Sequence, residues 1–260
     1  MKRKLLCGLL AAASLSLSAH GYRSSVPVQV DGGRIAGGYL ESGVTYVPLR
    51  SLLGALGNWD IRWDAGAGRA VAASGSRHLT ASPAEDTLTV NGRTLRGQVT
   101  LQDGTTYVPL RLVSEALGGS AEWDPYMEGA AVTSAESAYD AVELYWLSRI
   151  IYAESGAESL EGQIAVGSVV LNRVKSPDFP ASVPGVIFDR KNGVQFEPVS
   201  NGSVYKTPSP SSLEAARRAL DGEQPVGQAL YFFAPALSQG TWITANRTYL
   251  RTIGCHRFYL

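Results

Sequence analysis

Glu154 is the residue of this chain best placed for acid–base chemistry. It ends an apolar run, residues 150–153, and small residues follow it at once, from Ser155 to Ala157. A carboxyl group at the end of a hydrophobic helix loses part of its hydration, which disfavours the charged form and raises the pKa. The sequence therefore predicts that Glu154 is a general acid near neutral pH.

Two other acids lie close to Glu154 in the sequence. Glu161 falls in the first turn of the next predicted helix, where a negative charge stabilises the helix N-terminus. Glu158 lies in the loop before that helix, and both a structural hydrogen bond and a substrate contact suit this setting. On the same helix, Gln163, Asn172 and Arg173 lie on or near one face. They either orient Glu154 or contact substrate, or they form a polar seam with no role in chemistry.

Cys255 and His256 are adjacent, which raises the possibility of a nucleophile pair. Adjacent residues of a strand point to opposite faces, so their side chains should not meet. We expect His256 to be a packed structural histidine. After removal of a leader, His78 is the only other histidine, one in each half of the chain. We therefore expect no metal site and no other cofactor.

The elements that must position Glu154 are helices. Val142, Trp146 and Ile150 recur at the spacing of one helical face, which predicts a helix that begins near Asp140. A second helix is predicted over residues 159–174, and Pro177 ends it. A capping box at Ser211-x-x-Glu214 predicts a third helix, which stops at Gly222. Strands are expected at residues 228–233, 242–243 and 256–259.

The first half, residues 22–136, contains an internal duplication. The run from Val44 to Arg50 recurs from Thr105 to Arg111, and a short helical pattern and a Trp-Asp pair follow each copy. Asp31-Gly32 and Asn91-Gly92 favour tight hairpin turns. Each copy therefore predicts a hairpin, a strand, a short helix and a strand, with Pro48 and Pro109 at the helix starts. The aromatic side chains suit the core of two small β-rich units better than sugar stacking. They are Tyr46, Tyr107, Trp59, Trp63 and Trp123.

These repeats resemble the copper amine oxidase N-terminal-like module of exported bacterial proteins, over most of residues 26–134. The resemblance implies a wall attachment or spacing domain. His78 is the only histidine in this half and no cysteine accompanies it, so a copper ligand set is missing.

Residues 1–21 have the pattern of a signal peptide: Lys2-Arg3-Lys4, an apolar stretch, and small residues at a cleavage site. We expect export and then secretion, since no later segment is long enough to span a membrane. Cleavage leaves three more acidic than basic side chains, which gives no reason to expect nucleic acid as a partner. Cys255 is then the only cysteine, so no intramolecular disulfide can form. We expect a monomer.

Several motifs follow one another in the second half. They are Arg149 to Glu154, Glu158 to Gly167, Val170 to Val174, Phe179-Pro180, Pro184 to Phe188, Gln195-Phe196, Pro198-Val199, Asn201-Gly202, Tyr205, Ala229 to Phe233 and Ile253 to Phe258. With these motifs in this order, residues 144–259 resemble the SleB-type cell wall hydrolase family, the spore cortex-lytic enzymes. The resemblance implies a lysozyme-like helical core with its catalytic glutamate at Glu154. It also implies substrate contacts at Glu158, Gln195, Phe196 and Tyr231, although an aromatic residue in a buried strand is more often core.

The resemblance implies a peptidoglycan lytic transglycosylase. Ordinary glycoside hydrolysis uses two carboxylates. A lytic transglycosylase instead lets the 6-hydroxyl of the muramic acid attack the anomeric carbon, so one acid suffices and the product carries a 1,6-anhydro end. Glu154 would donate a proton first and accept one afterwards.

The sequence thus predicts an α+β protein with a signal peptide (1–21), a duplicated module (22–136) and a catalytic half (140–260). The predicted substrate is the MurNAc–GlcNAc bond in spore cortex or cell wall, in germination, sporulation or wall turnover. Three alternatives stay open: a non-catalytic peptidoglycan-binding protein, a hydrolysing muramidase and a wall amidase.

Overall fold

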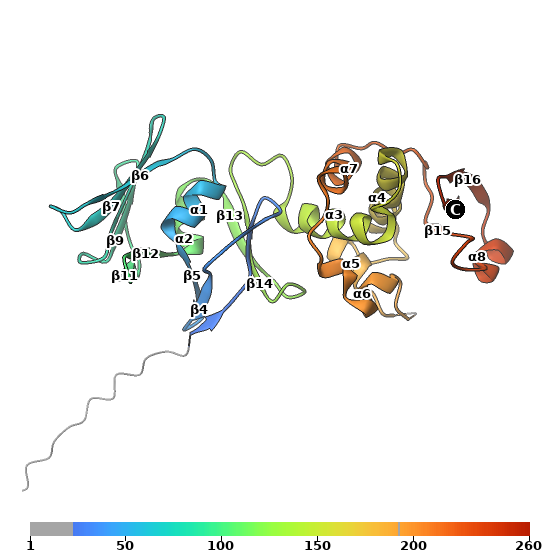
Figure 1. Cartoon of the computed structure of the whole chain (residues 1–260), viewed down its shortest axis with the longest axis horizontal. Helices are drawn as coiled ribbons and strands as arrows, with labels where there is room; N and C mark the ends of the chain where they lie inside the picture. The colour runs from blue at the N-terminus through green and yellow to red at the C-terminus, as the bar shows by residue number, and fades with distance from the viewer. Residues whose placement is uncertain (1–22, 192) are drawn as a thin grey trace, which may run out of the picture.

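The computed structural model describes residues 23–191 and 193–260, so the predicted signal peptide lies outside the described residues. A β-rich first half and a mainly helical second half lie one after the other along the long axis (Figure 1). The predicted α+β class is confirmed. Within the described residues, no helix combines the length and the apolar character needed to cross a membrane.

The first half consists of three sheets and two short helices, α1 (Leu49–Ala55) and α2 (Leu110–Ala116). The first sheet has the order β1 (Ser24–Ser25), β4 (Tyr39–Glu41), β5 (Val44–Pro48), β12 (Thr105–Pro109) and β11 (Thr100–Gln102). The second has the order β10 (Arg93–Arg96), β9 (Thr87–Val90), β8 (Arg77–Ser82), β7 (Arg69–Ser74) and β6 (Asp60–Asp64). The third has the order β13 (Ser120–Asp124), β14 (Gly129–Thr133), β2 (Val28–Val30) and β3 (Gly33–Ile35).

The two sequence repeats do not form two separate units, contrary to the prediction. The first repeat contributes β2 to β7 and the second contributes β8 to β14, yet each sheet contains strands of both. In the central sheet β5 pairs antiparallel with β12, and Val47 lies opposite Val108, its own counterpart. This register relates the repeats by a local twofold axis. One shared core results, because neither repeat alone has enough apolar surface to bury.

The local elements of the repeats follow the prediction. Asp31 and Asn91, the first residues of the two predicted turns, both have positive φ, of 48° and 49°, as a tight hairpin turn requires. Pro48 and Pro109 lie immediately before α1 and α2, with φ of −60° and −62°. The fixed φ of proline suits a helix start.

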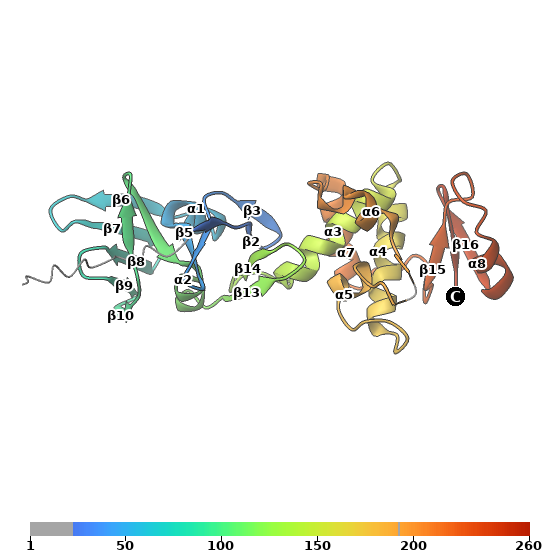
Figure 2. The same ribbon diagram turned by 90° about the horizontal axis from the view of Figure 1, so that it is seen from below.

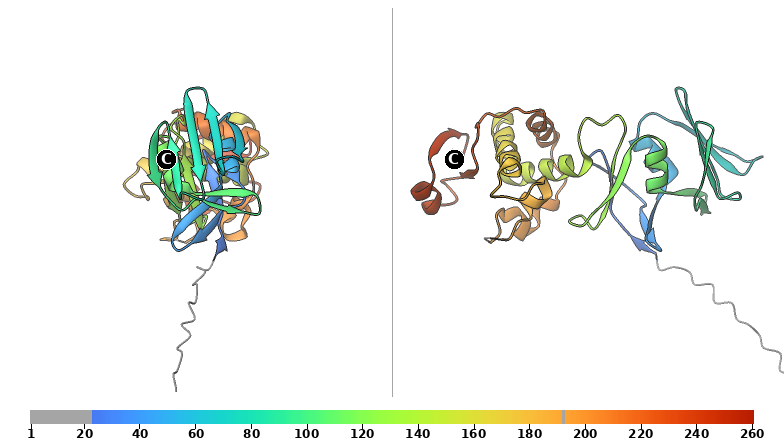
Figure 3. Two further views of the ribbon diagram at one scale, coloured as in Figure 1. Left: turned by 90° about the vertical axis from the view of Figure 1, so that its left-hand side faces the viewer. Right: turned by 180° about the vertical axis from the view of Figure 1, so that it is seen from behind.

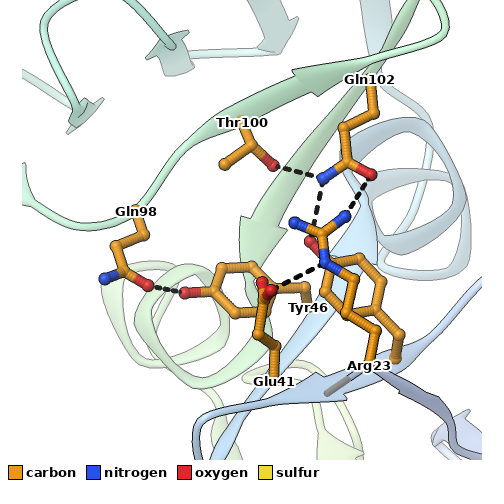
Figure 4. A network of polar contacts seen from close by, with 7 residues as sticks. Arg23, Glu41, Tyr46, Gln98, Thr100 and Gln102 are labelled. Carbon is orange, nitrogen blue, oxygen red and sulfur yellow. Dashed lines mark hydrogen bonds and ion pairs between the residues drawn. The ribbon is translucent and has the colours of Figure 1, made fainter. Parts of the chain in front are cut away.

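Polar contacts join the two edges of the central sheet (Figure 4). Arg23, just before β1, donates to Glu41 at 2.8 Å and to Gln102 of β11 at 2.6 Å. Tyr46 donates its hydroxyl hydrogen to Gln98. The Arg23 contacts hold the chain before β1 against the strand at the opposite edge.

The aromatic side chains of this half divide into two groups. Tyr46 and Trp59 are buried and Tyr107 is partly buried, as the core interpretation predicts. Trp63 and Trp123 are 43% and 44% exposed, so that interpretation is wrong for the tryptophan of each Trp-Asp pair.

The second half is a bundle of helices with a small sheet at the end far from the first half (Figure 2). The helices are α3 (Ala141–Ser155), α4 (Leu160–Lys175), α5 (Val183–Ile187), α6 (Glu197–Asn201), the 3₁₀ turn η1 (Ser203–Tyr205), α7 (Pro210–Leu220) and α8 (Thr241–Asn246). The sheet has the order β15 (Tyr231–Phe233), β17 (His256–Tyr259) and β16 (Tyr249–Ile253).

The predicted helix starts hold for α3 and α4, whose N-caps are Asp140 and Ser159. Helix α7 starts earlier than predicted: Ser209, not Ser211, accepts the capping hydrogen bond from Ser212, and Pro210 takes the first helical position. Proline at that position stabilises the start because it has no N–H to leave unpaired.

Three predictions about the strands need correction. Strand β15 covers residues 231–233 only, half of the predicted 228–233. Residues 242–243 belong to helix α8, and β16 lies outside all predicted strands. No residue of α8 is buried, so this short helix lacks the buried apolar face whose periodicity would have predicted a helix.

The two halves are joined by more than their linker. Trp146 of α3 donates its indole N–H to the buried carboxylate of Asp124 at 2.6 Å. Tyr126 stacks on Phe188, with ring centroids 4.4 Å apart. Figure 3 shows α3 next to the β13–β14 hairpin. The second Trp-Asp pair therefore connects the module to the first helix of the other half.

Candidate active site

Glu154 lies in the last turn of α3, where the prediction placed it. Leu147, Ile150 and Ile151 of this helix are fully buried and hold it in the core. Ser155, the last residue, donates its hydroxyl to the carbonyl of Ile151 at 2.9 Å. The helix end is therefore fixed, and the Glu154 side chain is only partly exposed.

The surroundings of Glu154 favour its protonated form. Burial, together with the smaller effect of the negative charge of Glu197, raises the pKa of this carboxyl from 4.5 to about 7. The positive charge of Arg173 acts in the opposite direction. Both the protonated and the ionised form of Glu154 are then accessible near neutral pH, as a group that both donates and accepts protons requires.

Arg173, in the last turn of α4, is the centre of the group around Glu154. Its Nε donates to the carbonyl of Leu230 at 2.8 Å. Its guanidinium carbon lies 5.0, 5.2 and 5.7 Å from the ring centroids of Phe179, Phe196 and Tyr231. From the sequence, Arg173 was predicted only to lie on a polar helix face with Gln163 and Asn172. Its aromatic neighbours could not be predicted, because they are distant in the chain.

The Arg173 side chain is 6% exposed, and its Nη1 is buried without a hydrogen-bond partner among the described residues. Burial lowers the pKa of Arg173 to about 10, so the group stays charged at neutral pH. Glu154 is among the negative groups that favour this charge. A buried cation beside a buried carboxyl lowers the cost of ionising that carboxyl.

Glu197 is the acid that the sequence analysis missed. It lies in the first turn of α6, directly after Gln195 and Phe196, and its side chain is exposed. It attracts no attention in the sequence because an acid at a helix start has an ordinary structural role.

The predicted substrate residues Phe196 and Tyr231 both lie against the same guanidinium group, that of Arg173. Phe196 is almost fully buried. The partly exposed Tyr231 accepts a hydrogen bond from Arg247 at 2.9 Å and lies 5.9 Å from the exposed ring of Trp242. Gln195 is also partly exposed, and its amide donates to the carbonyl of Gly193.

Glu158 connects the start of α4 to the turn between β16 and β17. Both of its carboxylate oxygens lie 3.3 Å from the backbone N–H of Cys255, and one lies 4.0 Å from Nδ1 of His256. His256 is buried and its ring packs edge-on against Phe232, whereas Cys255 is exposed. The packed histidine is confirmed. Burial lowers the pKa of His256 against the effect of Glu158.

Gln163 is 2% exposed, so other protein atoms surround its side chain. Its amide nitrogen donates to the carbonyl of Glu158 and to Ser211, and its oxygen accepts from Ser212 at 2.8 Å. Asn172 likewise donates to two backbone carbonyls. Gln163 and Asn172 therefore form a polar seam, one of the alternatives that the sequence analysis gave for them. The predicted contact of Gln163 with substrate is not possible in this structure, because the side chain is not accessible.

Two family matches divide the chain as the folds do. Residues 157–259 match the family described as Cell Wall Hydrolase, and residues 29–131 match the Copper amine oxidase N-terminal domain. Both resemblances seen in the sequence are confirmed. The first match begins three residues after Glu154. The support for Glu154 as the acid therefore comes from its position and burial in the structure, not from this match.

Several curated proteins are similar to the second half. A spore cortex-lytic enzyme of Bacillus cereus is 36% identical over 126 residues, which cover 48% of this chain and 47% of that protein. The spore cortex-lytic enzyme of Bacillus subtilis (strain 168) is 39% identical over 112 residues, 43% of this chain and 35% of that protein. The chain thus spans half the length or less of these two relatives.

Solved structures are similar to this chain as well. One of them is the catalytic domain of the germination-specific lytic transglycosylase SleB from Bacillus anthracis. The two are 36% identical, the match covers 48% of this chain and 98% of that one, and the TM-score is 0.44.

The raised pKa of Glu154 predicts a pH-dependent cost to stability. Between about pH 4.5 and 7 the folded chain keeps a proton that the unfolded chain has released. The contribution of this group to the free energy of unfolding therefore falls as the pH rises through that window. Glu154→Gln removes the cost. We expect the variant to be more stable than the parent by on the order of 2 kcal/mol at pH 8, and equally stable at pH 4, in urea unfolding. Equal stability at pH 8 would show that the carboxyl is well hydrated.

The contact between Glu158 and the β16–β17 turn predicts a sensitive glycine. Gly254 has φ of +55°, and a Cβ there would lie 1.8 Å from the Glu158 carboxylate. Gly222 has φ of +96° with open space around it, so it provides a matched control. We expect Gly254→Ala to lower the free energy of unfolding by about 2 kcal/mol more than Gly222→Ala does, in chemical denaturation. Equal losses would mean that Glu158 does not hold the turn.

Proposed function

We propose that the protein is a peptidoglycan lytic transglycosylase that cleaves the MurNAc–GlcNAc bond. The main support is one partly buried carboxyl, Glu154, whose pKa of about 7 lets it both donate and accept a proton. The family match of residues 157–259 and the relatives named above support the substrate class.

In the first step Glu154 donates its proton to the glycosidic oxygen, which leaves as the 4-hydroxyl of GlcNAc. The bond between this oxygen and C1 of MurNAc breaks. Glu154 is left as a carboxylate, and the positive charge of Arg173 stabilises that form. The hydrogen bond of Arg173 to the Leu230 carbonyl keeps its guanidinium in place before the charge develops.

In the second step the Glu154 carboxylate accepts the proton of the MurNAc 6-hydroxyl while that oxygen attacks C1. The product is a 1,6-anhydro sugar, and Glu154 returns to its protonated state. No water enters the reaction, so one carboxyl performs both proton transfers.

The sugar contacts that we propose begin at Tyr231, whose ring centroid lies 5.7 Å from the guanidinium carbon of Arg173. The partly exposed Tyr231 and the exposed Trp242 and Arg247 form a group of two rings and a guanidinium. The guanidinium carbon of Arg247 lies 4.5 Å from the centre of the Tyr231 ring and 5.0 Å from that of the Trp242 ring. Gln195 adds a polar group to the proposed surface. Phe196 is buried, so its part would be to hold Arg173. Glu158 would hold the β16–β17 turn.

The proposed location is a bacterial cell wall or spore cortex, reached by export. The cleaved leader and the domain boundaries at residues 22–136 and 140–260 remain predictions from the sequence. The relatives are spore cortex-lytic enzymes, which favours cortex glycan as the substrate.

The products of digestion test the proposal. The parent chain should release fragments with 1,6-anhydromuramic ends from purified cortex and from vegetative sacculi, identified by mass. Glu154→Gln should lower the rate by about 10² or more, because the amide cannot transfer the proton. Glu161→Gln, an exposed acid of the same region, should keep the parent rate. Digestion by the Glu154→Gln variant at the parent rate would contradict the assignment.

Glu197 favours a second candidate function, a hydrolysing muramidase. Its negative charge acts on Glu154, and a hydrolysing enzyme uses a second carboxylate to activate water or form a glycosyl intermediate. Glu197→Gln separates the two. For a lytic transglycosylase we expect activity within about threefold of the parent and a pH profile shifted to lower pH, because one negative neighbour of Glu154 is gone. Reducing muramic ends from the parent, with activity lost in Glu197→Gln, would establish the muramidase instead.

A further inference from the structure

The first half contains two grooves of nearly equal size that no known role explains. The first, the Trp123 groove, has a volume of about 420 Å³. Gly43, Val44 and Thr45 of the first repeat form one wall, and Arg111, Trp123 and Ala130 of the second repeat form the other.

The second, the Trp63 groove, has a volume of about 390 Å³. Here the second repeat contributes the glycine and the two residues after it, and the first repeat contributes the arginine, the tryptophan and the alanine. Gly104, Thr105 and Thr106 of the second repeat face Arg50, Trp63 and Ala70 of the first. The residues named for one groove correspond to those named for the other under the local twofold axis between β5 and β12, whereas Arg62 lines the Trp63 groove where Glu122 lines the Trp123 groove. The exchange of strands between the repeats therefore creates two similar grooves.

The tryptophan of each groove is left open by a small neighbour. Trp63 lies opposite Ala70 on the adjacent strand, and Trp123 lies opposite Ala130. Opposite residues of an antiparallel pair lie side by side on one face, so an alanine leaves the indole uncovered. Leaving each indole partly exposed gives up part of the free energy that its burial would contribute, and in both repeats the exposed ring lines a groove, as a binding surface requires.

The composition of the grooves fits a sugar ring. An indole face offers a flat apolar surface with a polar edge, and at least one arginine and one threonine also line each groove. A volume near 400 Å³ is in the range of small-molecule sites and accommodates one or two pyranose rings. Two similar sites on one rigid module suit a polymer that repeats the same unit.

We infer that the Trp63 and Trp123 grooves bind the glycan strands of peptidoglycan and hold the chain on its substrate. The choice of glycan rests on the proposed function of the second half. Trp123 also borders a third groove, of about 490 Å³, whose other wall includes Asp140, Ser182 and Pro184. A strand bound at Trp123 can thus continue toward the second half.

Binding to purified vegetative sacculi tests the inference. The full chain carries Glu154→Gln so that the sacculi stay intact, and the bound fraction is measured by sedimentation. Trp63→Ala and Trp123→Ala should each weaken binding about tenfold. The double variant should weaken it further, to what the second half provides alone, because two linked sites reinforce each other. Leu101→Ala, which removes an equally exposed apolar side chain of the same module outside both grooves, should bind like the parent.

Competition identifies the ligand. Glycan strands freed of their stem peptides should displace the chain, and the stem peptides alone should not. Displacement by the peptides only, or parental binding of the double variant, would overturn the inference. The inference would also fail if light scattering showed a dimer for the parent chain and a monomer for the double variant, while both bound sacculi equally.

The cleavage assay keeps this inference apart from the proposed function. With Glu154 intact, the Trp63→Ala/Trp123→Ala variant should cleave short soluble glycans at the parent rate and sacculi about tenfold more slowly. If no glycan is cleaved by any variant, the proposed activity fails, while the sedimentation result still decides whether the grooves bind glycan.

Discussion

The arrangement of the second half depends on keeping one carboxyl group poorly hydrated without making its ionisation impossible. The buried face of α3 holds Glu154 where burial raises its pKa to about 7. The charge of Arg173 opposes that effect, and Arg173 is itself held by the Leu230 carbonyl and three aromatic rings. The two opposing effects place the proton affinity of Glu154 where one group can act as acid and then as base.

The rest of the second half secures these two residues. The polar seam of Gln163 and Asn172 fixes α4, which carries Arg173, against the segments that follow it. Glu158 ties the small sheet to the start of the same helix. Buried polar groups with complete hydrogen bonding specify one arrangement of the elements around them, because any other arrangement leaves a polar atom unpaired.

The first half uses duplication in a different way. Its repeats exchange strands, so the core and both tryptophan grooves need both copies. Asp64 of the first Trp-Asp pair accepts from the backbone of Ala67 in its own turn. Asp124 of the second pair likewise accepts from the backbone of Tyr126 and Met127, and it also accepts the hydrogen bond of Trp146 from α3. The same motif therefore closes a strand turn in both copies and, in the second copy, also joins the two halves.

The sequence by itself determined the local structure: the α+β class, the hairpin turns at Asp31 and Asn91, the caps of α3 and α4, and the acid at the end of α3. These features depend on residues that are neighbours in the chain. Only the tertiary structure decided which strands pair across the repeats, that Trp63 and Trp123 stay exposed, that Glu197 acts on Glu154, and that Arg173 lies among three rings. Each of these depends on contacts between distant segments, and the pattern of one segment carries no information about its partner.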